Sequence, residues 1–68
     1  MQNKIAEIRN SADPKISQEE LAISVGISRT HLSEIENGKA EPGGQVMLRI
    51  AQALGKSVED IFFINIVV

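Results

Sequence analysis

Four polar side chains near the middle of the chain have the spacing of one exposed helix face: Arg29, Thr30, Ser33 and Glu34. The guanidinium of Arg29 can bond to both O6 and N7 of guanine, and the methyl group of Thr30 can contact a thymine methyl. Glu34 can accept from cytosine N4, although a carboxylate near phosphate is electrostatically costly. The alternative is a polar face in water, with Arg29 bound at most to phosphate. The first chemistry to consider is therefore the reading of DNA base edges.

The sequence contains no recognisable catalytic or metal-binding arrangement. His31 is the only histidine and there is no cysteine, so neither residue type can complete a metal ligand set. Glu19 and Glu20 are adjacent on an expected helix, where they point in different directions and suit the positive end of the helix dipole better than acid–base catalysis. There is no nucleophile–base pairing and no phosphate-binding glycine loop. We therefore expect a non-enzyme without cofactor or metal.

The composition allows one small domain. With 68 residues, no cysteine and Phe62 and Phe63 as the only aromatic residues, the core must consist mainly of aliphatic side chains. No stretch approaches the roughly 20 apolar residues of a membrane span, and the N-terminus lacks a signal-peptide pattern, so we expect a cytoplasmic protein without membrane contact. The net charge of −2 argues weakly against a nucleic-acid ligand. Charges beyond about 8–10 Å are largely screened at physiological salt, however, so the charge of the binding face matters more.

The elements that would position the polar residues are helices. Apolar residues recur at helical spacing in five segments, with turn residues between them. We expect helices over Asn3 to Ser11, Gln18 to Val25, residues 29–36 and Val46 to Leu54, then a short one capped by Ser57 that buries Val58, Ile61 and Phe62. Residues 39–44 read as a loop, and the β-branched residues 64–68 predict a strand. The predicted fold class is all-α, with a short C-terminal strand or extended tail.

The ends of the second and third helices carry local signals. Ser17 followed by Glu20 has the pattern of a capping box, and Ser28 can cap the third helix. Gly26 can supply the positive φ of a tight turn, and the pair Asn37-Gly38 tolerates left-handed geometry. These two helices should therefore be short and joined by a sharp turn.

Residues 18–37 match the pattern of a helix-turn-helix unit. The small Ala22 lets two helices cross closely, and Gly26 permits the turn between them. Five apolar residues would hold the crossing angle: Leu21, Val25, Ile27, Leu32 and Ile35. All seven matches together, with the caps in register, favour a helix-turn-helix over an ordinary helical hairpin.

Two segments resemble the Cro-like phage-repressor family: residues 17–39, with Ser17-Gln18-Glu19-Glu20-Leu21-Ala22 and Ile35-Glu36-Asn37-Gly38-Lys39, and residues 50–62, with Ile50-Ala51-Gln52-Ala53-Leu54-Gly55. The resemblance covers about residues 4–63. It implies a five-helix, lambda-repressor-like fold whose third helix enters the major groove of a palindromic operator, in a transcriptional repressor. It also implies a structural ion pair between Arg9 and Glu36. The longer turn over residues 10–16, and Gly43-Gly44 in place of a capping serine, depart from the family pattern.

Five residues are candidates for phosphate contacts: Gln18, Ser28, His31, Asn37 and Lys39. Gln18 resembles the family's phosphate-clamping position, where its amide and the helix dipole would face the DNA backbone together. Asn37 and Lys39 follow the third helix, but an asparagine before glycine is also a common helix C-cap, so both interpretations of Asn37 stand. His31, on the flank of the third helix, is expected to be a polar surface residue or a phosphate contact.

A single short recognition helix touches few base pairs, so we expect a homodimer that reads two half-sites of double-stranded DNA. The chain then divides into a helix-turn-helix domain over residues 1–63 and an apolar tail over residues 64–68, which could pair with its two-fold mate. The expected interface residues are Phe63, Ile64, Ile66, Val67 and Val68. Alternatively, the tail folds back on its own core. A second function for the same fold is that of an antitoxin or protein-interaction module, which the acidic net charge slightly favours.

Overall fold

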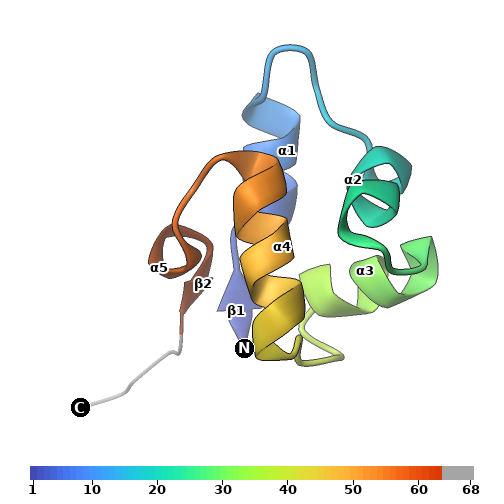
Figure 1. Cartoon of the computed structure of the whole chain (residues 1–68), viewed down its shortest axis with the longest axis vertical. Coiled ribbons are helices and arrows are strands. Elements are labelled where there is room, and N and C mark those ends of the chain that lie inside the picture. The colour runs from blue at the N-terminus through green and yellow to red at the C-terminus, as the bar shows by residue number, and fades with distance from the viewer. Residues whose placement is uncertain (64–68) are drawn as a thin grey trace.

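The computed structural model describes residues 1–63, and five short helices form most of this part of the chain (Figure 1). In chain order, the helices are α1 (Ile5–Ser11), α2 (Gln18–Val25), α3 (Arg29–Glu36), α4 (Gly44–Leu54) and α5 (Val58–Ile61). Two short strands, β1 (Gln2–Asn3) and β2 (Phe62–Phe63), join the two ends of the described chain. In Figure 1, α4 lies between α5 on one side and the α2–α3 pair on the other. The expected all-α class is confirmed.

The helix-turn-helix unit has the predicted bounds. The backbone N–H of Glu20 donates to Ser17 Oγ over 3.0 Å, and the backbone N–H of Ser17 donates to Glu20 Oε1 over 3.1 Å, so the capping box is complete. Gly26 ends α2 with φ +83°, a left-handed conformation that glycine adopts without a steric penalty. Ser28 then caps α3 by accepting from the backbone N–H of His31 over 3.0 Å. Local signals are therefore sufficient to define both ends of this turn.

The core lies where α2, α3 and α4 meet α1 and α5. Its buried hydrophobic residues are Ile5, Leu21, Ala22, Val25, Leu32, Ile35, Ile50, Ala51, Ile61 and Phe62. Five of the seven residues expected to hold the helix-turn-helix are buried in this core. Gly26 lies at the turn itself, and Ile27 is half-buried against the same core. Burying one such aliphatic side chain contributes about 1.5–3 kcal/mol. The crossing of α2 and α3 is thus held by packing rather than by surface contacts.

The N-terminal end of the chain differs from the prediction. We expected the first helix to begin at Asn3, but α1 begins at Ile5 because Asn3 belongs to β1. In the antiparallel β1–β2 pair, Gln2 is opposite Phe63 and Asn3 is opposite Phe62. This contact joins residues about 60 positions apart, and no local sequence pattern predicts it.

Three further expectations need correction. Ser57 occupies the N-cap position of α5, but its hydroxyl donates to Asp60 Oδ2 over 2.7 Å instead of accepting from a backbone N–H. Phe62 is buried, as expected, but lies in β2 rather than on α5. α4 begins at Gly44, inside the expected loop over residues 39–44 and two residues before Val46. The pair after α3 does include a left-handed residue, as expected, because Gly38 has φ +74°. The tail predicted to form a strand, residues 64–68, lies outside the described residues.

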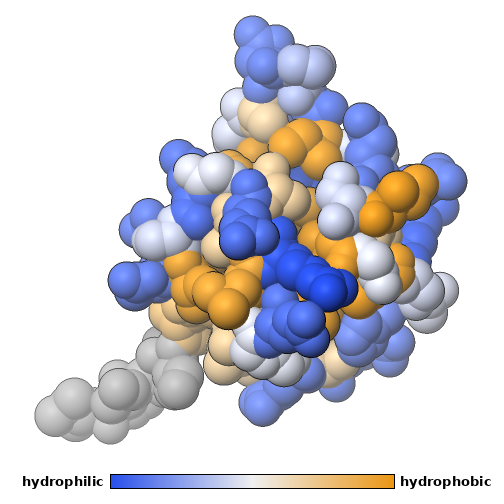
Figure 2. Space-filling model, in the orientation of Figure 1, coloured by the Kyte–Doolittle hydropathy of each residue, from blue (hydrophilic) through white to orange (hydrophobic). Residues whose placement is uncertain are grey.

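The surface is mixed rather than uniformly polar. Figure 2 shows apolar surface in several groups between polar side chains on this face of the molecule. Among residues 1–63, the large hydrophobic side chains that remain exposed are Ile23, Leu48 and Phe63. No helix in this part of the chain combines the length and the apolar character needed to cross a bilayer.

Candidate nucleic-acid interface

A shallow hollow of about 330 Å³ lies over the outward face of α3. The residues that line it are Gln18, Arg29, Thr30, Ser33, Glu34, Asn37 and Lys39. The structure therefore brings together all four base-reading candidates and three of the five phosphate candidates. They come from the start of α2, the length of α3 and the turn that follows α3.

Burial of the opposite side of α3 turns this face outward. Leu32 and Ile35 are both 0% exposed, and at 100° per residue the positions opposite them face away from the core. Arg29, Thr30 and Glu34 are accordingly exposed, and Ser33 is half-buried. The backbone N–H of Lys39 donates to the carbonyl of Glu34 over 2.8 Å, which folds the turn after α3 back toward its last turn and carries Lys39 to the hollow.

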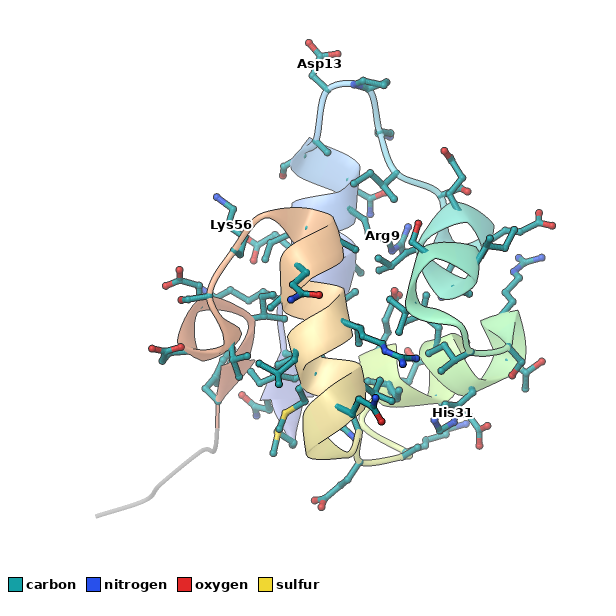
Figure 3. All side chains as sticks on the ribbon, in the orientation of Figure 1. Arg9, Asp13, His31 and Lys56 are labelled. Carbon is teal, nitrogen blue, oxygen red and sulfur yellow. The ribbon has the colours of Figure 1, made fainter. Side chains whose placement is uncertain are left out.

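An ion pair between Arg9 and Glu36 lies next to Gln18, one of the residues that line the hollow. Nε and Nη2 of Arg9 donate to the two carboxylate oxygens of Glu36, each over 2.9 Å, and Nη1 donates to the carbonyl of Ile16 over 3.1 Å. The two side chains are only 10% and 6% exposed. Figure 3 shows Arg9 on α1 reaching toward the α2–α3 unit. The bidentate pair both joins α1 to α3 and neutralises a carboxylate that would otherwise repel phosphate.

Gln18 connects this ion pair to the outer face. Its Nε2 donates to Glu36 Oε1 over 3.1 Å, and its Oε1 accepts from Arg29 Nε over a long 3.5 Å. The orientation of the amide is consistent with its neighbours, because the carboxylate needs a donor and the guanidinium needs an acceptor. Within residues 1–63, the terminal nitrogens of Arg29 form no hydrogen bond, so they can bind an external acceptor.

Two of the five phosphate candidates, Ser28 and His31, lie outside the hollow. Ser28 Oγ already accepts from the backbone N–H of His31. His31 is half-buried, and Figure 3 shows it at the edge of α3. Asn37 is the C-cap residue of α3 and also lines the hollow, with a weak 3.4 Å bond from its Nδ2 to Ser33 Oγ. Both interpretations of Asn37 therefore agree with its position.

Comparison with known proteins agrees with this geometry. A family model described as helix-turn-helix matches residues 5–61. The chain belongs to the Cro-like helix-turn-helix family. An uncharacterized HTH-type transcriptional regulator of Methanocaldococcus jannaschii is 39% identical over 62 residues, which cover 91% of each chain. The uncharacterized HTH-type transcriptional regulator YgzD of Bacillus subtilis is 36% identical over 65 residues, which cover 96% of each chain.

The charge around the hollow of this helix-turn-helix protein differs from that of the whole chain. The lining residues include two cations, Arg29 and Lys39, and one anion, Glu34, whereas the chain as a whole carries −2. Glu36, which accepts from Gln18 Nε2, is paired with Arg9. The candidate interface is therefore net positive, and the acidic overall composition does not decide what this face can bind.

Two polar contacts near the helix-turn-helix were not anticipated. Asn3 Nδ2 donates to the carbonyl of Ile35 in the last turn of α3 over 2.9 Å. Arg49 Nη1 donates to the carbonyl of Val25 at the end of α2 over 3.3 Å. Both join residues more than 20 positions apart, so only the tertiary fold reveals them. In the described part of the chain, no three His, Cys, Asp or Glu side chains are grouped to hold a metal ion.

Proposed function

We propose that this DNA-binding transcriptional regulator reads a specific double-stranded sequence by placing α3 in the major groove. The observation that carries the proposal is the hollow, where the first turn of α3, the start of α2 and the turn bearing Lys39 form one net positive surface. A recognition helix contacts bases mainly through residues of its N-terminal part, with the preceding helix against the backbone.

In this proposal, Arg29 is the principal base contact. Gln18 holds its Nε side and leaves the terminal nitrogens to form a bidentate contact with guanine O6 and N7. Thr30, Ser33 and Glu34 lie along the same face and read the neighbouring base pairs. Thr30 offers a methyl group to thymine, and Glu34 accepts from cytosine N4.

The phosphate contacts would surround this reading face. The exposed ammonium of Lys39 and the first backbone N–H groups of α2, beside Gln18, are suited to successive phosphates. Asn37 at the end of α3 adds an amide donor. Ser28 and His31, outside the hollow, would contact the backbone at the opposite edge of α3 through the serine backbone N–H and the imidazole.

We further propose that the protein acts as a homodimeric repressor. An eight-residue helix is only about 12 Å long, so one copy of α3 covers few base pairs. Two copies on a palindromic operator would double the contacts. Phe63, which is 38% exposed at the end of β2, begins the proposed interface, and Ile64, Ile66, Val67 and Val68 would continue it.

A second candidate function, favoured by the acidic net charge of −2, is that of an antitoxin or protein-interaction module on the same fold. Purification of the protein from its native cell distinguishes the two candidate functions. A stoichiometric partner protein that covers the chain, together with no bound DNA sequence, would support the second candidate.

Selection from a random double-stranded DNA pool tests the first proposal. We expect enrichment of a palindrome whose half-sites are one helical turn, roughly 10 base pairs, apart. The Arg29→Ala variant should lose the preference at one base pair in each half-site and retain it elsewhere. If the wild-type chain enriches no sequence, the proposal of sequence-specific binding is wrong.

A further inference from the structure

Asn3 forms two hydrogen bonds that connect separate parts of the fold. Its Nδ2 donates to the carbonyl of Ile35 over 2.9 Å, and its Oδ1 accepts from the backbone N–H of Ile5 at the start of α1 over 3.2 Å. The same residue is opposite Phe62 in the β1–β2 pair. One half-buried side chain thus joins α1, α3 and the strand pair.

The acceptor of the Asn3 amide lies at a sensitive place in α3. The last carbonyls of a helix have no partner within it, so its end is held by whatever donors the surrounding structure supplies. The carbonyl of Ile35 receives two, Gly38 N–H over 3.1 Å and Asn3 Nδ2. Because α3 has only eight residues, a shift at this end would move the whole reading face.

Asn3 itself does not line the candidate interface, although its own hollow shares Asn37 with it. It lines a small hollow of about 250 Å³ with Met1, Gln2, Glu36, Asn37, Gly38 and Phe63, and it is absent from the residues that line the hollow over the outward face. The strand that carries it is in turn fixed, because the backbone N–H of Lys4 donates to the carbonyl of Ile61 over 2.8 Å. Asn3 therefore links the β1–β2 pair to the end of α3, and its side chain does not line the hollow over the outward face.

We propose that Asn3 is a positioning residue for sequence-specific DNA binding, which sets the end of α3 through the Ile35 carbonyl. This inference rests on the proposed function. It implies that discrimination between operator and random DNA depends on Asn3, whereas electrostatic attachment to any DNA does not. It also implies that the amide groups just after Ile35 are protected from hydrogen exchange partly by Asn3.

The variant that tests this most directly is Asn3→Asp. The aspartate keeps an acceptor for the Ile5 N–H and nearly the same shape, but an oxygen replaces the donor and faces the Ile35 carbonyl. Asn10→Asp is the matched control, because Asn10 is exposed on α1, forms no side-chain hydrogen bond within residues 1–63, and undergoes the same change of charge. Asn3→Ala, which removes the donor without adding repulsion, provides a second variant if Asn3→Asp does not fold.

Two quantities are measured for each variant, at a temperature below its unfolding transition. Affinity for the selected operator is expected to fall about tenfold in Asn3→Asp, with affinity for random DNA changed less than about twofold. In the DNA-free protein, exchange of the Asn37, Gly38 and Lys39 amides should become about tenfold faster while the α2 amides stay unchanged. Asn10→Asp should alter neither quantity by more than about twofold.

Several outcomes would overturn the inference. The inference is wrong if both Asn3 variants discriminate between operator and random DNA as well as the wild-type protein does. It is also wrong if they lose affinity for operator and random DNA equally. Exchange that accelerates uniformly along the chain would show a structural role without a positioning one. If wild-type protein selects no operator, the proposed function itself fails, and the exchange measurement then still reports whether Asn3 holds the end of α3.

Discussion

The two sides of α3 differ in how far their polar groups are satisfied within the protein. On the inward side, Arg9 and Glu36 form a buried bidentate pair with 2.9 Å contacts, and Asn3 binds the last turn over 2.9 Å. On the outward side, Arg29 has one long 3.5 Å contact, and Thr30 and Glu34 are exposed. A face with satisfied hydrogen bonds fixes the helix, whereas a face with unused donors and acceptors can bind a ligand without first breaking internal contacts.

Disrupting the ion pair on the inward side of α3 should give the largest effect, a loss of stability. Arg9→Leu leaves the Glu36 carboxylate buried without its cation, which should lower the free energy of unfolding by about 3–5 kcal/mol. Urea denaturation followed by circular dichroism measures this change. The double variant Arg9→Leu/Glu36→Leu removes both charges and should recover most of the loss. A single variant as stable as wild type would show that the ion pair does not hold α1 to α3.

Changing the outward side should affect binding and leave stability almost unaltered. Arg29→Ala should cost about 1–3 kcal/mol of binding free energy at one base position, because a bidentate guanine contact is lost. Binding isotherms on the selected operator and on operators changed at single positions measure it. An equal loss on every sequence would instead assign Arg29 to phosphate.

The start of α3 provides a smaller test, because Ser28 serves both sides by fixing where the helix begins. Ser28→Ala removes the acceptor for the His31 N–H and should reduce stability by about 1 kcal/mol. Ser24→Ala is the control, because Ser24 is exposed within α2, where alanine is at least as favourable. Thermal unfolding compares the two, and equal midpoints would mean that the cap adds nothing.

The smallest effect is expected at the rim of the outward side. Lys39→Ala should weaken binding to all sequences alike and reduce the slope of log affinity against log salt by about 1. Lys56→Ala should leave the slope unchanged, because Lys56 is exposed beyond α4, on the far side from α3 in Figure 3. If both variants give the same slope, Lys39 does not contact phosphate.

The two sides of α3 also differ in how well they could be predicted from the sequence. Ser17, Gly26 and Ser28 act on neighbours within four residues, so local rules define α2 and α3 closely. The helical period then identifies the outward residues, because Leu32 and Ile35 must be buried. The resemblance to the Cro-like family contributed the Arg9 and Glu36 positions.

What escaped prediction depends on distant contacts. Asn3 binds Ile35, 32 positions away, and pairs with Phe62 at the other end of the described chain. Nothing in the neighbourhood of Asn3 distinguishes a strand from the start of a helix. Ser57 is a local exception, since its hydroxyl donates to the side chain of Asp60, three residues on, instead of accepting from a backbone N–H.

The inward side of α3, with its hydrogen bonds satisfied within the protein, has a practical consequence for protein engineering. The buried pair, the core residues and Asn3 hold the helix, and positions 29, 30, 33 and 34 add only two long side-chain contacts, Arg29 with Gln18 and Ser33 with Asn37. Those four positions can therefore be randomised together as a combinatorial library. Every member would share one scaffold, so new operator preferences could be selected without rebuilding the fold.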